Sequence, residues 1–401
     1  MGFDTSIGSV VVWLDALPFD LSARTSRKRR YHEAFSPPSS TMEPSTPRAS
    51  GSRAGRISTT PSLSSASSKR SKRSNSPAKL FPLYGVEGHR LVRDSLMKVT
   101  TSLSPTLRHL LGDVGDAASR HGIIPRRAKE ALEKHIETTG QFDRLRELMF
   151  CDDSTWHGSC FGGEDLVRRA VLIASRSAKC SRMLSDEPAW NNHVHSPLLE
   201  MLVQDMQDGP NQGIFDFLSC TTTSIDLTYH RFPDAASRVD YVFHFLPEDD
   251  PTISLHDDVP TAAYPCFNWT TDRLLQQSPL GISIETKRYG GDTVKGEQQL
   301  GIWQAAHWEF LVSCVGQDVA ESLEFLPGIV VQGQTWSLLV STRRQGVTTI
   351  LGSVEFGNTG SAIGVFQVLA GLRRLRRWSL DVLWPWYRHH LPGLQVTEPS
   401  Y

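Results

Sequence analysis

The polar and apolar positions divide the chain into a tail without hydrophobic periodicity and a longer region with regular patterns. Residues 19–80 show neither a helical nor a strand period, and residues 1–80 contain 19 Ser and 7 Pro. A segment with so few apolar side chains cannot offset the entropy that it loses on ordering. We therefore predict that residues 1–80 form a disordered, basic, Ser/Pro-rich tail.

Helical spacing dominates residues 81–181, which predict a helical support region. Apolar residues recur at three- and four-residue offsets from Leu91 to Leu103 and again from Leu107 to Leu111. Further helices are predicted over residues 126–136, 142–150 and 164–181. This layer carries no residue pattern that indicates chemistry.

Residues 182–392 combine helical and strand periods and predict an α/β core. Predicted helices cover residues 186–206, 293–314 and 361–378. Predicted strands cover residues 221–229, 238–245, 282–287, 328–333, 335–341 and 347–355. Strands grouped on both sides of a crossover helix indicate a mixed sheet flanked by helices.

Charge separates the same two regions. Residues 1–80 carry 13 Lys and Arg against 5 Asp and Glu, a net charge of +8, and residues 81–401 carry 29 against 38, a net charge of −9. Two basic clusters, residues 27–30 and 69–73, lie in the tail. Short exposed basic runs suit a nuclear import receptor, which predicts a nuclear protein; a merely solubilising tail is the alternative.

Cysteine usage and hydropathy exclude several classes of protein. The six cysteines are scattered without a C-x-x-C pair, so neither a zinc finger nor a disulfide scaffold is expected. No apolar run approaches the 18 residues of a membrane-spanning helix, so we expect no membrane partner. None of these patterns specifies an oligomeric state.

The strand predicted over residues 282–287 carries the first candidate chemistry. Side chains alternate between the two faces of a strand, so residues two apart point the same way. In the sequence ISIETK, Glu285 and Lys287 therefore share one face, while isoleucines anchor the other. Among the ten lysines of the chain, Lys287 alone has an acid two positions before it.

A second acid, Asp240, lies in the otherwise apolar strand RVDYVFHF. A buried carboxylate needs a partner because burying an unpaired charge is costly. One alternative is a structural salt bridge with Arg238 or another cation. The other is that Asp240 and Glu285 bind a hard divalent cation, Mg²⁺ or Mn²⁺, through their oxygens. Such an ion activates water and stabilises the charge that develops on a phosphate, and Lys287 would assist it.

Five segments together resemble the PD-(D/E)XK nuclease-like superfamily, and in particular a fungal subgroup of it. They are Trp190-Asn191…Val194-His195, Val239-Asp240-Tyr241, Ser283-Ile284-Glu285-Thr286-Lys287, Gln299-Leu300…Trp303 and Trp384-Pro385-Trp386. The resemblance covers residues 180–390, and the basic Ser/Pro-rich leader is similar too. Five segments in the same order are far more specific than one triplet.

The resemblance implies a restriction-endonuclease-like core and a role for each site residue. Asp240 and Glu285 would ligate the metal, Lys287 would be the catalytic lysine, and Gln299 would complete the site from the following helix. Glu187 matches an acid that some members place beside the metal. The usual proline of the motif is replaced by Val239.

The 45 positions between Asp240 and Glu285 leave the metal partner open. Acids within this excursion that could replace one of the two are Glu248, Asp249, Asp250, Asp257 and Asp258.

Other polar and aromatic patterns have simpler interpretations. Positions two apart on a helix diverge by about 200°, so His193 and His195 cannot chelate one ion, and we expect one packed and one exposed ring. Trp303 and Trp308 could stack bases, but their apolar neighbours favour core packing. The dense basic run Arg373, Arg374, Arg376 and Arg377 is either a face that contacts nucleic-acid phosphates or a solvated helix face.

The sequence thus supports two function classes. The leading hypothesis is a metal-dependent nuclease that hydrolyses phosphodiester bonds of nucleic acid, with DNA as the expected substrate. The alternative is a catalytically silent member that acts as a nuclear binding or scaffold module. The complete Asp240, Glu285 and Lys287 set favours the enzyme, whereas the −9 charge of residues 81–401 opposes contact with a polyanion.

Overall fold

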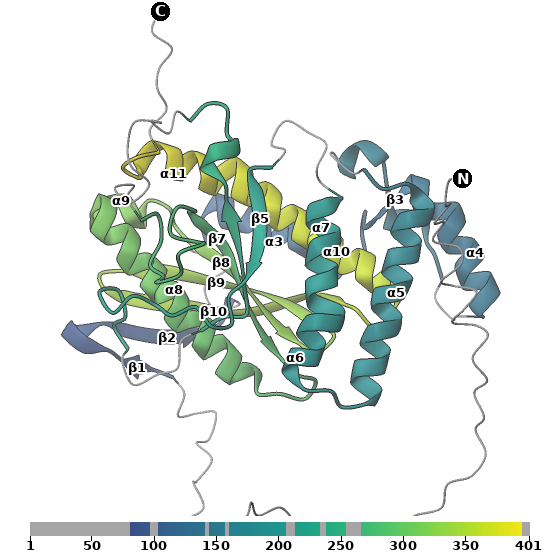
Figure 1. Ribbon diagram of the computed structural model, residues 1–401, viewed down its shortest axis with the longest axis horizontal. Helices are drawn as coiled ribbons and strands as arrows, with labels where there is room; N and C mark the ends of the chain where they lie inside the picture. Colours follow the sequence, from purple (N-terminus) through teal and green to yellow (C-terminus); the bar gives the residue numbers. More distant parts are fainter. Residues whose placement is uncertain are drawn as a thin grey trace, which may run out of the picture. The chain divides into compact units, whose positions relative to one another are not determined.

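An eight-stranded mixed sheet forms the centre of the fold (Figure 1). The computed structural model describes residues 81–96, 103–140, 144–156, 160–205, 213–232, 238–253 and 266–394, all within the unit Ser71–Tyr401. The predicted tail, with its two basic clusters, lies outside the described residues.

The strand order is β1-β2-β10-β9-β8-β7-β6-β5. The strands are β1 (Leu83–Tyr84), β2 (Arg90–Asp94), β5 (Phe215–Ser219), β6 (Tyr241–Phe245), β7 (Leu280–Lys287), β8 (Leu326–Gln332), β9 (Thr335–Arg344) and β10 (Val347–Asn358). A short parallel pair, β3 (Ile124–Pro125) with β4 (Phe150–Cys151), lies apart from this sheet.

Two pairings within the sheet are parallel, β7 with β8 and β2 with β10, and the others are antiparallel. A parallel pair needs a long crossover, which α8 (Thr293–Val315) supplies between β7 and β8. The expected mixed α/β sheet is confirmed.

Helices cover both faces of the sheet (Figure 1). Helix α8 packs on one face, where Trp308 donates from Nε1 to Ser341 Oγ of β9 at 3.1 Å. Helix α10 (Ala362–Trp378) packs on the other, so closely that a Cβ on Gly371 would lie 2.3 Å from the Phe356 ring. The remaining helices are α3 (Pro105–Ala118), α4 (Lys129–Thr139), α5 (Gly163–Arg182), α6 (Glu187–Trp190), α7 (Ser196–Gln204), α9 (Gln317–Glu321) and α11 (Trp384–His390).

Several sequence predictions are confirmed in this core. The predicted helices over 164–181, 293–314 and 361–378 correspond to α5, α8 and α10. The helix predicted over 186–206 exists as α6 and α7, joined by a π-helical turn over Asn191–His195. Trp303 and Trp308 are fully buried, as core packing requires. Within the described residues, no helix is both long and apolar enough to cross a membrane.

The helix predicted from Leu91 is wrong at its start, because residues 90–94 form strand β2. A short apolar run fits a helix or a strand equally well, and here a distant partner decides. Residues 347–351 of β10 pair with β2 in parallel. Part of the predicted helical support region therefore belongs to the core sheet.

Two further predicted elements are corrected. The described end of the helix predicted over 142–150 is a 3₁₀ turn, Glu147–Met149, followed by strand β4. The strand predicted over 221–229 makes a single bridge, Ile225 with Thr270. Its β-branched and aromatic residues serve another purpose, because Tyr229 packs edge-on against Phe310 and so covers α8.

Candidate active site

The register between β6 and β7 brings the two predicted acids together. Tyr241 of β6 pairs with Ile284 of β7, and the Asp240 amide donates to the Ile284 carbonyl at 3.0 Å. Asp240 and Glu285 are therefore neighbours across the end of this antiparallel pairing, although 45 positions separate them in the sequence. Both residues are buried, with 7% and 2% of their surface exposed.

Strand alternation gives β7 two different polar faces at this end. Glu285 and Lys287 project toward α8, where Gly296 leaves room: a Cβ there would lie 3.7 Å from Glu285 Cγ and 3.4 Å from Lys287 Cγ. Thr286 projects to the opposite face, toward the π-helical turn. The predicted shared face of Glu285 and Lys287 is confirmed.

Asp240 is held by three hydrogen bonds. Its Oδ2 accepts from the backbone amide and from the hydroxyl of Thr286, each at 2.8 Å, and its Oδ1 accepts from the Asn191 side-chain amide at 3.2 Å. A carboxylate oxygen has two lone pairs, so Oδ1 retains one for a further ligand. No cation neutralises Asp240 directly among the described ion pairs, so the salt-bridge alternative with Arg238 is not what the structure has.

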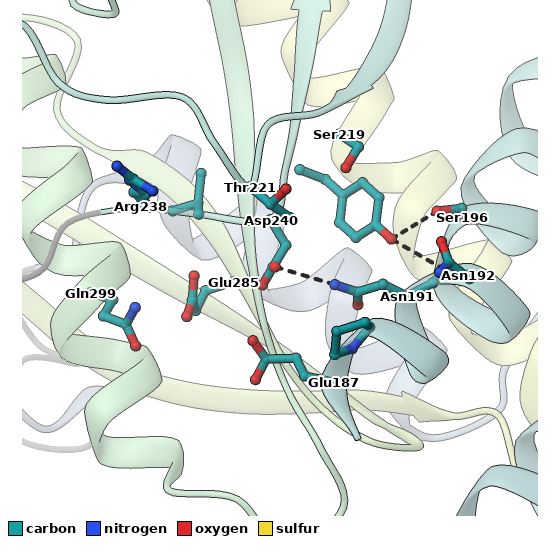
Figure 2. Close-up of a pocket in the computed structure, with 13 residues that line it drawn as sticks. Glu187, Asn191, Asn192, Ser196, Ser219, Thr221, Arg238, Asp240, Glu285 and Gln299 are labelled. Carbon is teal, nitrogen blue, oxygen red and sulfur yellow. Dashed lines mark hydrogen bonds between the residues drawn. The ribbon is translucent and has the colours of Figure 1, made fainter. Parts of the chain in front are cut away.

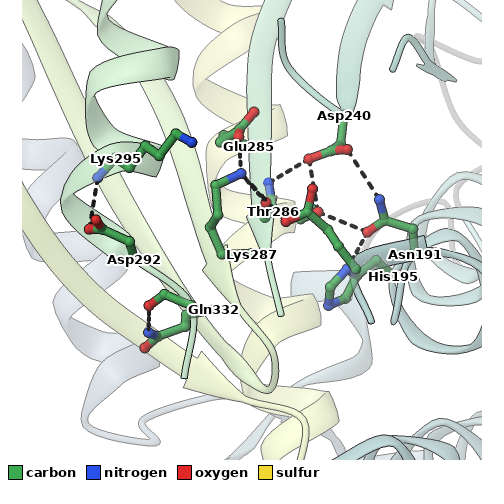
Figure 3. A network of polar contacts seen from close by, with 11 residues as sticks. Asn191, His195, Asp240, Glu285, Thr286, Lys287, Asp292, Lys295 and Gln332 are labelled. Carbon is green, nitrogen blue, oxygen red and sulfur yellow. Dashed lines mark hydrogen bonds and ion pairs between the residues drawn. The ribbon is translucent and has the colours of Figure 1, made fainter. Parts of the chain in front are cut away.

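Lys287 connects the acids on the α8 face (Figure 3). Its ammonium donates to Glu285 Oε1 and to the Thr286 carbonyl, the latter at 2.8 Å, and lies 3.5 Å from Glu187 Oε2. Only 12% of the Lys287 side chain is exposed. The ammonium is thus enclosed by two carboxylates, with Asp240 as a third nearby.

The charge at this end of the sheet is out of balance. Burial raises the pKa of Glu285 to about 8, and the neighbouring Asp240 and Glu187 add to this rise despite the opposing effect of Lys287. Burial likewise raises the pKa of the half-buried Glu187. Burial lowers the pKa of Lys287, but the carboxylates of Glu285, Glu187 and Asp240 together outweigh burial and raise that pKa. Two of the three carboxylates here, Glu285 and Glu187, pair with the Lys287 ammonium.

Glu187 reaches the site because α6 begins there. Asp186 caps the helix by accepting from the Ala189 amide at 3.1 Å, and Pro188 favours the first turn. The acid at the first turn is also stabilised by the helix dipole. The predicted Asp-Glu-Pro helix start therefore positions a carboxylate over the sheet end.

The π-helical turn that follows α6 adds buried amide and imidazole groups. Asn191 contacts Asp240 and Thr286, and His195 contacts Asn191. Burial lowers the pKa of His195 to about 4, so the ring is neutral at neutral pH. His193 is exposed, which confirms the expectation of one packed and one exposed histidine.

A cavity of about 540 Å³ opens beside these groups. Figure 2 shows the carboxylates of Glu187, Asp240 and Glu285 around one space, with the Gln299 amide facing it from α8. Arg238 lies at its rim, exposed, with a 3.4 Å hydrogen bond to Ser224 Oγ. The other lining residues are Pro188, Asn191, Asn192, Ser196, Ser219, Thr221, Val239 and Tyr241.

The residues at this cavity fit a hard divalent cation in their donor chemistry. Carboxylate oxygens are the ligands that Mg²⁺ and Mn²⁺ prefer. Burial, with a smaller effect of Asp240 and Glu187, raises the pKa of Glu285, and a bound cation would instead stabilise its carboxylate form. Among the described residues, no three His, Cys, Asp or Glu side chains are already gathered as a metal-ligand set. Instead, the Lys287 ammonium lies between Glu285 and Glu187.

Comparison with known proteins agrees with this geometry. The sequence matches the PD-(D/E)XK nuclease superfamily over residues 131–384, more than half of the chain. The chain belongs to the PD-(D/E)XK nuclease superfamily. No curated protein and no solved structure matches it. The resemblance inferred from the five segments is confirmed at the level of the superfamily.

Within this PD-(D/E)XK fold, the structure gathers the five predicted residues Asp240, Glu285, Lys287, Gln299 and Glu187 around one cavity and its edge. The acids of the long excursion lie elsewhere where they are described. Asp250 accepts a hydrogen bond from Trp384 Nε1 at 2.8 Å and does not line the cavity. Asp257 and Asp258 lie outside the described residues.

The predicted basic run does not line the cavity, and most of it makes intramolecular contacts. Arg373 pairs with Asp205 at 3.1 Å, Arg374 donates to the His121 carbonyl at 3.0 Å, and the Arg376 guanidinium lies over the Phe215 ring. Burial lowers the pKa of Arg373 and of Arg376 to about 10. Arg377 is the exposed member of the run.

Sequence reasoning missed three polar residues of the site. Thr286 fills the variable position between Glu285 and Lys287, and its two donors both reach Asp240. Asn191 lies in the quoted Trp-Asn segment, whose helical spacing drew attention to its apolar members. The sequence suggests Arg238 as a salt-bridge partner of Asp240, whereas in the structure it lines the cavity. An alternating Thr in the motif strand was the one available signal.

Proposed function

We propose that this protein hydrolyses the phosphodiester bonds of nucleic acid, with DNA as substrate, and requires Mg²⁺ or Mn²⁺. The observation that carries the proposal is the set of three carboxylates at one cavity, Glu187, Asp240 and Glu285, with Lys287 as the cation that forms ion pairs with two of them. Membership of the PD-(D/E)XK nuclease superfamily supports the reaction class.

Asp240 and Glu285 would hold the cation, which supplies charge stabilisation for the phosphate and lowers the pKa of a bound water. Asp240 offers the open lone pair on Oδ1, and Glu285 loses its proton in doing so. Glu187 is close enough to Lys287 to keep the ammonium charged when Glu285 turns away from it. Gln299 can donate or accept a hydrogen bond at the wall that faces these acids.

Lys287 is the residue that acts on the reacting groups. Its ammonium has three hydrogens and no acceptor, so it can donate to a phosphoryl oxygen and to the attacking water. At the rim, the exposed Arg238 is suited to a neighbouring phosphate of the substrate, because a guanidinium matches phosphate geometry. Further contact with the phosphate backbone would come from Arg377 of the predicted basic run.

A cleavage assay on wild type and two variants separates this enzyme from a silent scaffold. Purified protein with Mn²⁺ should cut single- or double-stranded DNA, and EDTA should stop it. Lys287→Ala should lower kcat by about 10²- to 10³-fold while leaving Mn²⁺ affinity largely intact, since the ammonium does not ligate the ion. Asp240→Ala should abolish both binding and cleavage.

A matched control is Lys179→Ala, which removes an exposed lysine from α5 and should change neither property. The alternative function, a catalytically silent scaffold, is favoured by one feature: three of the four lone pairs of the Asp240 carboxylate already accept hydrogen bonds from the chain. A wild-type protein that binds no Mn²⁺ and cuts neither DNA nor RNA would decide for that scaffold.

Nuclear localisation is part of the proposal and rests on residues 27–30 and 69–73 alone. Replacing the basic residues of both clusters should move a fluorescent fusion out of the nucleus through loss of an import receptor. Unchanged nuclear accumulation would remove this part of the proposal without affecting the enzymology.

A further inference from the structure

A series of buried polar contacts runs from Asp240 to the π-helical turn (Figure 3), and a further contact leads to the hairpin between β8 and β9. Asn191 Nδ2 donates to Asp240 Oδ1 at 3.2 Å, and His195 Nδ1 lies 2.9 Å from Asn191 Oδ1. At the other side of the ring, His195 Nε2 lies 2.9 Å from the Gly333 carbonyl. A neutral imidazole has one N–H, so the ring donates either from Nδ1 to Asn191 Oδ1 or from Nε2 to Gly333, and not to both. Asn191 and His195 are 8% and 0% exposed.

The turn itself explains why both side chains face the sheet. Asn191 and His195 are four positions apart, a spacing that places them on the same side of a helix. The turn Asn191–His195 is π-helical, a local widening that is frequent at functional sites. The His195 ring is fixed by two tryptophans, since it stacks on Trp190 at 5.9 Å and meets Trp336 edge-on at 5.7 Å.

The amide of Asn191 has one productive orientation. Its Nδ2 must face the Asp240 carboxylate, because the Oδ1 of the amide would be repelled there. Oδ1 then points to the Thr286 hydroxyl at 2.9 Å and to His195. The same Thr286 hydroxyl lies 2.8 Å from Asp240 Oδ2, so Asn191 and Thr286 together hold both oxygens of the carboxylate.

The far end of the series is tied to the catalytic strand. Gly333 donates from its amide to the Lys287 carbonyl at 2.7 Å while its own carbonyl faces His195. Its φ of +55° and a clash of any Cβ with Tyr289, at 3.0 Å, require glycine at this position. One residue therefore connects the backbone of the proposed catalytic lysine with the ring that abuts Asn191.

We propose that Asn191, whose Oδ1 accepts from the Nδ1–H tautomer of His195, is the positioning residue that orients the Asp240 carboxylate toward the metal. The proposal rests on the proposed metal-dependent nuclease function for its consequence, but not for its geometry. Groups that orient a metal ligand in this way typically change metal affinity or activity by about 10- to 100-fold when they are removed. Neither Asn191 nor His195 needs to touch substrate.

The test uses the full chain with a readout that requires neither metal nor activity. The Thr286 amide donates to Asp240 Oδ2, so its hydrogen exchange, followed by NMR, reports whether the carboxylate stays in place. In Asn191→Ser we expect this amide to exchange about tenfold faster or more, while Ile284 in the same strand is unchanged. Mn²⁺ affinity measured by calorimetry should fall by about 10- to 100-fold.

His193→Ser is the control, because it introduces serine at an exposed residue of the same turn that does not line the cavity. It should leave both the Thr286 exchange rate and the Mn²⁺ affinity as in wild type. Unchanged Thr286 exchange in a folded Asn191→Ser protein would overturn the positioning role. If wild type itself binds no metal, the proposed function fails, and the exchange experiment still decides on the geometry.

A pair of histidine variants keeps the proposal testable if Asn191→Ser does not fold. The amide nitrogen of Asn can replace Nδ1 of histidine, and that of Gln can replace Nε2. His195→Asn should therefore preserve slow Thr286 exchange better than His195→Gln, and His193→Ala should have no effect. The reverse order, with His195→Gln closer to wild type, would mean that His195 serves only the Gly333 hairpin and would overturn its role in holding Asn191.

Discussion

Glu285 and Glu309 are two deeply buried carboxylates, one packed against α8 and one within it, and they differ in how many cations pair with them. Glu285 projects from β7 toward α8, and Glu309 belongs to α8 itself. Their side chains are 3% and 6% exposed. Burial of a charge demands compensation in both cases, but the two regions provide it differently.

The Glu309 region is balanced. Arg343 pairs with Glu309 Oε1, Arg231 pairs with Oε2 at 3.0 Å, and His89 lies 3.0 Å from Oε1. Arg231 also reaches Glu87 at 3.4 Å, so two acids meet two guanidinium groups. These residues come from β9, from α8, from the segment before β2 and from the segment between β5 and β6. Their ion pairs hold these segments together.

The Glu285 region has three carboxylates, and among the described ion pairs only Lys287 pairs with any of them; the region also borders a cavity instead of being closed by its partners. Burial is the main cause of the raised pKa of Glu285, and the neighbouring carboxylates of Asp240 and Glu187 add to it. The comparison teaches that burial of charged groups does not identify a functional site. A surplus of negative charge that faces a cavity is the better indicator of such a site, because this charge is stable only while a proton or another cation neutralises it.

The largest expected effect is on the balanced region. Glu309→Gln leaves Arg343, itself 3% exposed, without its carboxylate and should lower the free energy of unfolding by about 3–5 kcal/mol. Glu285→Gln, the matched change in the other region, should leave stability at pH 8 unchanged or raised. Urea denaturation of both variants measures this. Equal destabilisation by the two substitutions would contradict the comparison.

The pH dependence of stability should show the imbalance next. An acid whose pKa rises from its usual value to about 8 on folding stabilises the protein below the unfolded pKa, and this contribution is lost as the pH rises toward 8. Wild type should therefore lose up to a few kcal/mol of stability between pH 5 and pH 8 that Glu285→Gln does not lose. Parallel stability curves for the two proteins would refute an elevated pKa at Glu285.

Metal should stabilise the unbalanced region alone. Mn²⁺ at one hundred times its Kd adds about 2.7 kcal/mol to a protein that binds it only when folded, which calorimetric melting detects as a higher Tm. The rise should occur in wild type and in Glu309→Gln, be absent in Asp240→Ala, and grow with pH as Glu285 loses its proton. A rise that survives in Asp240→Ala would place the ion elsewhere.

The smallest expected effect concerns a cation that belongs to neither region. Arg377→Ala should leave stability unchanged and reduce the slope of log affinity against log salt concentration for DNA by about 1. Arg373, which pairs with Asp205, provides the contrast, since its removal should reduce stability instead. A salt slope identical to that of wild type would exclude Arg377 from the nucleic-acid interface.

The outcome for the basic run shows where sequence reasoning reaches its limit. Four arginines in five positions of a helix indicate a charged surface. However, a helix completes a turn in 3.6 residues, so these side chains point in all directions around its axis. Because α10 packs against the sheet and other helices, Arg373 and Arg376 are largely buried against Asp205 and Phe215. Only the neighbours of α10 decided which arginine is exposed.

The sequence by itself determined what depends on neighbouring residues. The two-residue period of a strand put Glu285 and Lys287 on one face, and the Asp-Glu-Pro signal began the helix that carries Glu187. Such local geometry follows from backbone sterics and capping, which need no distant partner. The motif order in the chain identified the superfamily for the same reason.

The tertiary structure alone decided what depends on distant pairing. It placed Asp240 beside Glu285 through the β6–β7 register, made residues 90–94 a strand by pairing them with β10, and surrounded Asp240 with Asn191 and Thr286. A short apolar segment fits a helix or a strand equally well when alone. Packing of the whole core selects among these states, and that selection is what brings three carboxylates to one cavity.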